Sequence, residues 1–277
     1  MRLWHVTLWT RLAVLTCAAL CTCLALTACV SSETSRLDAL TTPEPNALRE
    51  RALRRLSLAT AYFEQGQNTV AQQEVRAALQ IDPHFADAYN LLGLIHQRDA
   101  AAQLAEQSFQ QALELASTAE TQSATLASAQ HNYGWFLCEQ HRFNEAHTQF
   151  SRALQHPTYR QPAKTWMALG VCQQKAGQTA DARQSFEQAL KLDNRYPLAR
   201  YQWASLEQAS NPVRAQEILT PLNRSADANA ASLSLGIELA QALSQAREAQ
   251  ALVAQLTQYF PNSIQAQAWL QKTPQDQ

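Results

Sequence analysis

Four segments of this chain repeat one pattern of small and large side chains at a spacing of roughly 34 residues. Each segment has a small residue in a first apolar stretch and an alanine twelve positions later. Small side chains at this spacing let two helices cross closely, and larger side chains beside them fill the space around the crossing. The small positions are Ala59, Gly93, Gly134 and Gly170, followed by Ala71, Ala105, Ala146 and Ala182. The pattern therefore predicts a row of helix-turn-helix units.

A spacing of about 34 residues is typical of tetratricopeptide repeats. The sequence therefore predicts an all-α fold, a tetratricopeptide repeat superhelix of about six helix-turn-helix repeats, four of them clear and two weak. The weak repeats are expected around residues 203–219 and 235–261. The repeat domain is predicted at residues 47–270, with a polar tail at residues 271–277. An ordinary helical bundle with chance periodicity is the alternative.

Glycine marks the turn inside two of the clear repeats, at Gly66 and Gly177, where a positive φ is useful. Ala100 and His141 stand in the corresponding places of the other two, so these turns are expected to differ. The step from Gly93 to Gly134 exceeds the standard repeat by about seven residues. A helix or loop around residues 117–123 is therefore expected to extend beyond the standard unit.

Residues 1–28 are predicted to be a lipoprotein signal peptide. Arg2 and Arg11 precede an apolar stretch at residues 12–26 that carries no charge, which resembles the charged and apolar regions of a secretory signal. The stretch is too short to predict a transmembrane helix. Residues Leu26-Thr27-Ala28-Cys29 fit the bacterial lipobox, so Cys29 is predicted to be the lipid attachment site, carrying acyl chains such as palmitate. An ordinary signal peptide cut near this point is the alternative.

Residues 29–46 are predicted to form a lipidated, flexible tether. The segment is rich in Ser, Thr and Pro and has no apolar helical face. A chain of this length has a reach of roughly 20–25 Å. Multiple acyl chains give stable anchoring in a membrane. Val30 is not the Asp that commonly retains lipoproteins in the inner membrane, so the expected location is the periplasmic leaflet of the outer membrane.

Composition and motifs favour a binding protein over an enzyme. Removal of residues 1–28 leaves 20 basic and 23 acidic side chains, a net charge of −3, which predicts no nucleic-acid partner. The chain contains none of the common hydrolase, metalloprotease or phosphate-loop motifs, so no catalytic residue, cofactor, metal or small-molecule substrate is expected. Cys138 and Cys172 remain after processing. A disulfide between them and two separate core thiols are both compatible with the sequence.

The first helices of such repeats line a concave groove in which a partner segment lies. Leu94, Trp135 and Val171 share one position in their repeats, so stacking aligns them as an apolar stripe with Trp135 as a candidate anchor. Packing of Trp135 against the 117–123 insertion is the alternative. The residues predicted to project into the groove are Asn90, Leu94, Gln97, His131, Asn132, Trp135, Glu139, Lys164, Met167, Val171 and Lys175. Asn132 and Lys164 match two places of the carboxylate clamp of one repeat subclass, but Leu94 and Ala168 replace its other polar groups, which argues against that clamp.

The third repeat and its surroundings resemble the type IV pilus biogenesis/stability lipoproteins, the PilF/PilW family. The resemblance rests on the lipobox and on Asn132 through Cys138, Phe143 through Ala146, Pro157, and Ile81 through Gly93. It implies a pilotin, an outer-membrane lipoprotein that binds type IV pilus secretin subunits and promotes their outer-membrane localisation and multimerisation. A tetratricopeptide lipoprotein scaffold for β-barrel assembly or cell-wall synthesis is the alternative. The sequence leaves open which secretin segment is bound, whether the concave or convex face binds it, and the oligomeric state.

Overall fold

The computed structural model describes residues 45–118 and 123–272. The predicted signal peptide, Cys29, most of the predicted tether and most of the predicted polar tail lie outside these ranges. The described part contains 13 helices and no strand. Among these helices, none combines the length and the apolar character that crossing a bilayer requires.

Twelve of the helices form six consecutive pairs, and α14 follows the last pair. The prediction of an all-α array of about six repeats is confirmed, including the two weak repeats. The helices are α2 (Pro45–Glu64) and α3 (Asn68–Ile81), α4 (Ala86–Arg98) and α5 (Ala102–Thr118), α6 (Ser123–Glu139) and α7 (Phe143–Leu154), α8 (Pro162–Lys175) and α9 (Thr179–Leu192), α10 (Pro197–Glu207) and α11 (Pro212–Asn223), α12 (Ala230–Ala242) and α13 (Ala246–Tyr259), and α14 (Ile264–Lys272).

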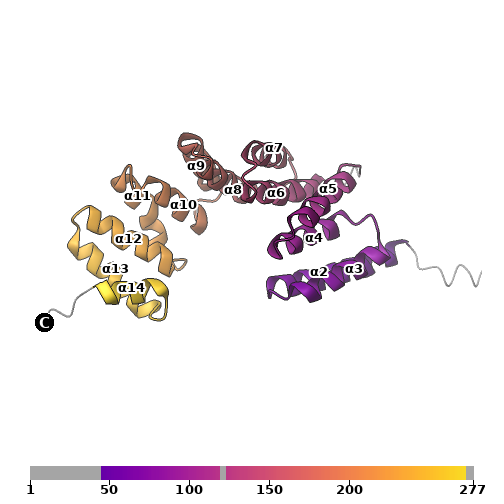
Figure 1. Ribbon diagram of the computed structural model, residues 1–277. Helices are drawn as coiled ribbons and strands as arrows, with labels where there is room; N and C mark the ends of the chain where they lie inside the picture. Colours follow the sequence, from indigo (N-terminus) through magenta and orange to yellow (C-terminus); the bar gives the residue numbers. More distant parts are fainter. Residues whose placement is uncertain (1–44, 119–122, 273–277) are drawn as a thin grey trace, which may run out of the picture.

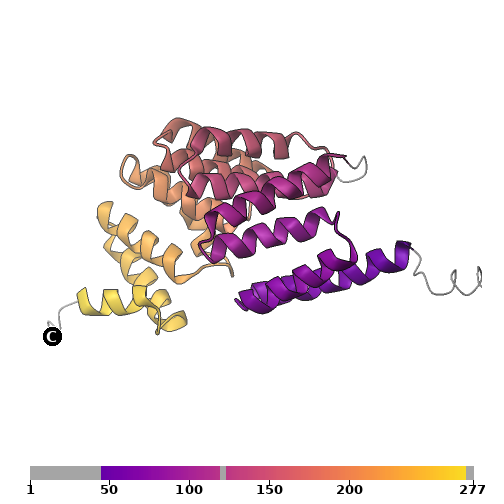
Figure 2. The ribbon, with the colours of Figure 1, turned by 45° about the vertical axis from the view of Figure 1, so that its right-hand side comes forward.

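The six pairs stack along an arch (Figure 1). The second helices α7, α9 and α11 lie along its outer edge, while α6, α8 and α10 lie on the inner side. Successive first helices from α2 to α10 also contact one another. Figure 2 shows α4, α5, α6 and α7 layered above the first pair. The concave face predicted from the sequence is therefore built from first helices.

The small residues lie where the two helices of a pair cross. An ideal Cβ on Gly93 would come 2.6 Å from the ring of Phe109, and one on Gly170 would come 2.6 Å from Phe186. An ideal Cβ on Gly134 would come 3.0 Å from the ring of Phe150. These distances leave no room for a larger side chain without movement of the ring. The helices of these three pairs are therefore held together by a phenylalanine packed directly on glycine backbone.

The turns inside the four clear repeats are alike, and the prediction that the turns at Ala100 and His141 differ is wrong. Ala100 and His141 have φ values of 58° and 60°, in the left-handed region that Gly66 (76°) and Gly177 (77°) also occupy. In each turn this residue's N–H binds the carbonyl three residues back, and the next N–H binds the carbonyl five residues back. These bonds satisfy carbonyl groups at the end of the first helix, which offsets the strain of a positive φ in a residue other than glycine.

The extra residues between the second and third repeats extend helices. Both α5 and α6 have 17 residues, whereas α3, α8 and α9 have 14. Residues 119–122 between them lie outside the described ranges. Pro162, Pro197 and Pro212 begin α8, α10 and α11, where the missing N–H has no helical partner to lose. At the C-terminal end, α14 packs on α12 and α13 and buries Ala266 in their shared core.

Candidate functional site

The predicted groove residues lie on α4, α6 and α8, three successive first helices in contact. Leu94, Trp135 and Val171 are all half-buried. Leu94 and Trp135 pack against the central core cluster around Phe136 and Phe150. Val171 packs against the next cluster, around Phe186. The three side chains thus present part of their apolar surface at equivalent positions of adjacent repeats.

Most of the polar groove residues bind one another across repeat boundaries. Asn132 Nδ2 donates to Asn90 Oδ1 at 3.0 Å, and Gln97 Nε2 donates to Glu139 Oε2 at 2.6 Å. The Lys175 ammonium lies 5.4 Å from the centre of the Trp135 ring, within the range of a cation–π contact. These contacts fix the relative positions of α4, α6 and α8. A ligand at this surface meets a preordered set of polar groups on either side of Trp135.

Trp135 lies far from Ser123, the last residue of the insertion that was the alternative contact for it. It stands twelve residues beyond Ser123, the first residue of α6, which corresponds to roughly 18 Å along the helix axis. Its apolar neighbours in the described part of the chain belong to the core of the second to fourth repeats. Lys175 covers part of the ring, so the ring is accessible to a partner only on its remaining surface.

Met167 and His131 do not project into the groove, which corrects their predicted positions. Met167 is only 7% exposed and packs with Phe186 and Ala199. His131 is 5% exposed. The sequence pattern could not distinguish these positions, because the rotation of one repeat on the next decides which side of a first helix is covered. Lys164 lies on the first turn of α8 and is exposed.

The buried His131 belongs to a chain of hydrogen bonds between α6 and α8. Its Nδ1 lies 2.9 Å from Thr165 Oγ1, which lies 2.8 Å from the Tyr159 hydroxyl. Burial lowers the pKa of His131 to about 3, and the positive charge of Lys164 acts in the same direction. His131 is therefore neutral at physiological pH, and its ring serves as a packed polar contact.

A disulfide joins Cys138 on α6 to Cys172 on α8. The two Cα atoms are 5.7 Å apart, and both side chains are buried. The sequence left open whether these cysteines pair, and the structure places them together in the central core cluster. The bond connects the first helices of the third and fourth repeats, close to the part of the groove that contains Trp135.

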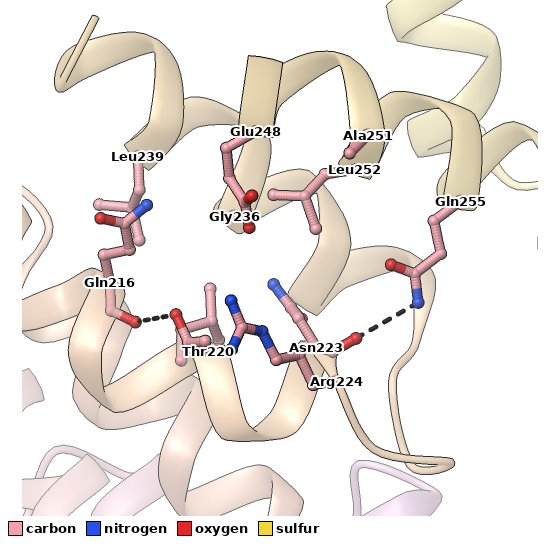
Figure 3. A pocket seen from close by; sticks show the side chains of 11 residues that line it. Gln216, Thr220, Asn223, Arg224, Gly236, Leu239, Glu248, Ala251, Leu252 and Gln255 are labelled. Atoms are coloured by element: carbon pink, nitrogen blue, oxygen red, sulfur yellow. Dashed lines mark hydrogen bonds between the residues drawn. The ribbon is translucent and has the colours of Figure 1, made fainter. Parts of the chain in front are cut away.

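A cavity of about 100 Å³ lies between α11, α12 and α13 (Figure 3). In three other repeats a phenylalanine covers the glycine of the first helix, but in the sixth repeat Leu252 lies opposite Gly236. Asn223 also points toward Gly236, and its Nδ2 donates to the Ser232 carbonyl at 3.1 Å. A shorter side chain at the phenylalanine position leaves space around the Asn223 amide. The sequence already showed leucine in place of phenylalanine at this repeat position, but this difference was not used to predict a cavity.

No catalytic arrangement emerges from the described ranges. Within them, no three His, Cys, Asp or Glu side chains are grouped so as to hold a metal ion. Partial burial raises the pKa of Asp87, but its carboxylate accepts a hydrogen bond from Thr125 and connects α4 to α6. The polar groups on the first helices are arranged for contact with other side chains.

Comparison with known proteins places this architecture among tetratricopeptide proteins. Family profiles described as TPR repeat and tetratricopeptide repeat match residues 59–99, 86–118 and 163–196. The type IV pilus assembly protein PilF of Pseudomonas aeruginosa is 30% identical over 213 residues, which cover 76% of this chain and 82% of PilF. An uncharacterised protein of Haemophilus influenzae is 26% identical over 141 residues, covering 51% of this chain and 75% of that protein.

Two solved structures resemble the whole array. The structure of Pseudomonas aeruginosa PilF aligns with a TM-score of 0.66 and 28% identity, covering 82% of this chain and 99% of PilF. The structure of PilW, described as a widely conserved type IV pilus biogenesis factor, aligns with a TM-score of 0.68 and 28% identity. That alignment covers 79% of this chain and 98% of PilW. The similarity thus extends over nearly the full length of both solved structures.

Proposed function

This chain belongs to the PilF/PilW family of tetratricopeptide proteins of type IV pilus biogenesis, and we propose that it is a pilotin. In this proposal it binds secretin subunits and promotes their localisation and multimerisation in the outer membrane. The observation that carries the proposal is the 30% identity to PilF over 82% of that protein. The chain acts through protein contacts and not through catalysis, in keeping with its tetratricopeptide fold.

The proposed location is the periplasmic leaflet of the outer membrane, with lipid on Cys29. The lipobox at residues 26–29 and the following Ser- and Pro-rich tether support this location. The Cys138–Cys172 disulfide is consistent with it, because structural disulfides persist in oxidising compartments such as the bacterial periplasm. The repeat array then lies within a tether's reach of the membrane in which secretins assemble.

Lipid attachment is tested by Cys29→Ser. We expect this variant to lose labelling by radioactive palmitate and to appear in the soluble periplasmic fraction or as an uncleaved precursor. Cys23→Ser is the matched control, since it makes the same change in the predicted signal peptide outside the lipobox and leaves labelling intact. Persistent labelling of Cys29→Ser would contradict the proposed anchor.

The proposed contact with secretin uses the surface around Trp135. Leu94 and Val171 flank Trp135 at equivalent positions and exclude water from the edges of an apolar contact. The Asn90–Asn132 and Gln97–Glu139 pairs hold the supporting helices in place before binding. A preformed surface loses less conformational freedom on association than a mobile one.

Trp135→Ala tests this contact. Loss of a desolvated aromatic anchor weakens binding by about 2 kcal/mol, or roughly thirtyfold. We expect fewer secretin multimers in isolated outer membranes and less secretin co-purified with the tagged protein. Leu104→Ala, which shortens an exposed side chain on α5, is the control and leaves both measurements unchanged. Normal multimer levels in Trp135→Ala cells that contain the variant protein would contradict this site.

A further inference from the structure

A second groove lies on the outer side of the arch, between the second helices α7 and α9 with α8 as its floor (Figure 1). Its volume is about 680 Å³. Asn144, His147 and Ser151 form one wall at a spacing that places them on one face of α7. Asp181, Gln184 and Gln188 form the opposite wall on α9 with the same spacing. This outer groove is separate from the surface around Trp135.

Four of the five amide side chains that line the outer groove are available for binding, while the fifth, Gln173, accepts a hydrogen bond from Ser185 Oγ at 2.6 Å. These four, Asn144, Gln178, Gln184 and Gln188, have no side-chain hydrogen-bond partner among the residues that the structure describes. The polar groups of the inner face differ, because Asn90 bonds Asn132 and Gln97 bonds Glu139. A side-chain amide offers one acceptor and two donors, which match the N–H and C=O groups of an extended peptide backbone.

The acidic side chains and the aromatic floor of the outer groove favour a peptide with a positively charged side chain. Asp181 and Glu187 line the groove, and no Lys or Arg is among its lining residues. Glu187 contacts Lys191 at 3.0 Å, but both side chains are at least half exposed, and such pairs are weak. The half-buried ring of Trp166 lies in the floor and offers a flat surface for an aliphatic stem or a cation.

We propose that the outer groove binds an extended segment of a partner protein that carries a Lys or Arg side chain. The amides of α7 and α9 bind the backbone of the segment. Asp181 and Glu187 bind the positive charge, and Trp166 packs against the stem of the same side chain. This function is additional to the proposed secretin contact, since it uses the opposite side of the array.

The test is a selection of short random displayed peptides on the purified full-length chain in detergent. We expect the selected peptides to be enriched in Lys and Arg and to have no amphipathic helical pattern. The combined change Asp181→Asn and Glu187→Gln should weaken the binding of selected peptides about tenfold at low salt and reduce its dependence on salt. Gln184→Trp should abolish binding by filling the groove while the helical content stays the same.

Two control variants make the test specific. Glu217→Gln removes an exposed acid of α11 that pairs with Arg214, as Glu187 pairs with Lys191, and should leave peptide binding unchanged. Trp135→Ala should also leave it unchanged, so failure of the secretin proposal and failure of this one are distinguishable. The proposal is wrong if Gln184→Trp binds as tightly as the unchanged chain or if Trp135→Ala loses binding. If the selected peptides are acidic or form amphipathic helices, the outer groove binds a different kind of segment and the proposal is also wrong.

Discussion

The buried imidazole of His131 links local packing to the pH dependence of stability. Its Nδ1 pairs with Thr165, and its ring lies 5.9 Å from that of Phe150. Protonation in the folded state would place a charge in the contact between α6 and α8. Burial and the nearby Lys164 oppose that charge, and this opposition lowers the pKa to about 3.

We predict that the free energy of unfolding falls as the pH drops from about 6.5 toward 3. In this range the unfolded chain binds a proton at His131 and the folded chain does not, so protonation favours unfolding. The contribution has a slope of up to about 1.4 kcal/mol per pH unit. Urea denaturation between pH 7 and pH 5 measures it. His131→Gln, which keeps a polar partner for Thr165, should flatten the curve, and an unchanged slope in that variant would contradict the prediction.

Replacing the glycines at the helix crossings by alanine is expected to change stability by different amounts at different crossings. A Cβ at Gly170 would lie 2.6 Å from the Phe186 ring, whereas one at Gly134 would lie 3.0 Å from the Phe150 ring. Crowding of a packed core costs about 1–3 kcal/mol, while alanine gains about 1 kcal/mol over glycine within a helix. We therefore expect Gly170→Ala to destabilise the protein and Gly134→Ala to be nearly neutral. Denaturant titration of both variants decides this, and a Gly170→Ala protein at least as stable as Gly134→Ala would contradict it.

At the scale of the elements, the turn between the paired helices is more constant in shape than in residue type. Gly66, Ala100, His141, Gly177 and Ser244 all have a positive φ and take part in the same pair of backbone hydrogen bonds. The geometry of these turns is therefore set by the backbone hydrogen bonds that end the first helix and by the position at which the second helix begins, and not by the residue type. Non-glycine residues in these turns carry backbone strain that glycine does not.

Exchanging residues between two such turns gives opposite effects. Ala100→Gly should stabilise the protein by roughly 1 kcal/mol, because glycine adopts a positive φ without a Cβ clash. Gly66→Ala should destabilise it by a similar amount, and no atom lies within 4 Å of the added Cβ, so the change reports backbone strain alone. Urea denaturation midpoints of the two variants measure the pair. Shifts of the same sign would show that the left-handed conformation is not what determines stability at these turns.

At the scale of the whole molecule, the array depends on contacts between neighbouring repeats, as in other solenoids. The Cys138–Cys172 disulfide adds a covalent link between the third and fourth repeats, near the middle of the arch. Arg142 reinforces the preceding boundary by pairing with Glu106 of the second repeat at 2.6 Å. The central repeats are therefore connected more firmly than contacts between apolar side chains alone would achieve.

Removal of the disulfide by combined Cys138→Ala and Cys172→Ala changes should lower the free energy of unfolding by about 2–4 kcal/mol. The bond joins cysteines with a sequence separation of 34 and so restricts the unfolded chain. Thermal unfolding with and without a reductant provides the measurement. The unchanged chain should become less stable on reduction, while the double variant should not respond. Equal responses would exclude a stabilising role for the disulfide.

The sequence by itself determined the helix pairs and their number, because contacts within a repeat recur at constant separations along the chain. The packing of Gly93 on Phe109 and of Gly170 on Phe186 follows from this regular spacing. The similarity to PilF, and with it the family, was also present in the residues of the third repeat. Even the weak fifth and sixth repeats kept enough small and apolar positions to be recognised.

Only the tertiary structure decided what happens between repeats. It paired Cys138 with Cys172, buried Met167, and joined groove residues such as Asn90 and Asn132 to one another. It also left four amides of the outer groove, including that of Gln184, without such partners among the described residues. These outcomes depend on the rotation of each repeat on the next, which is set by the combined packing of many side chains. The sequence pattern specifies which residues face the other helix of the same repeat. It does not specify the angle at which the next repeat packs on that repeat.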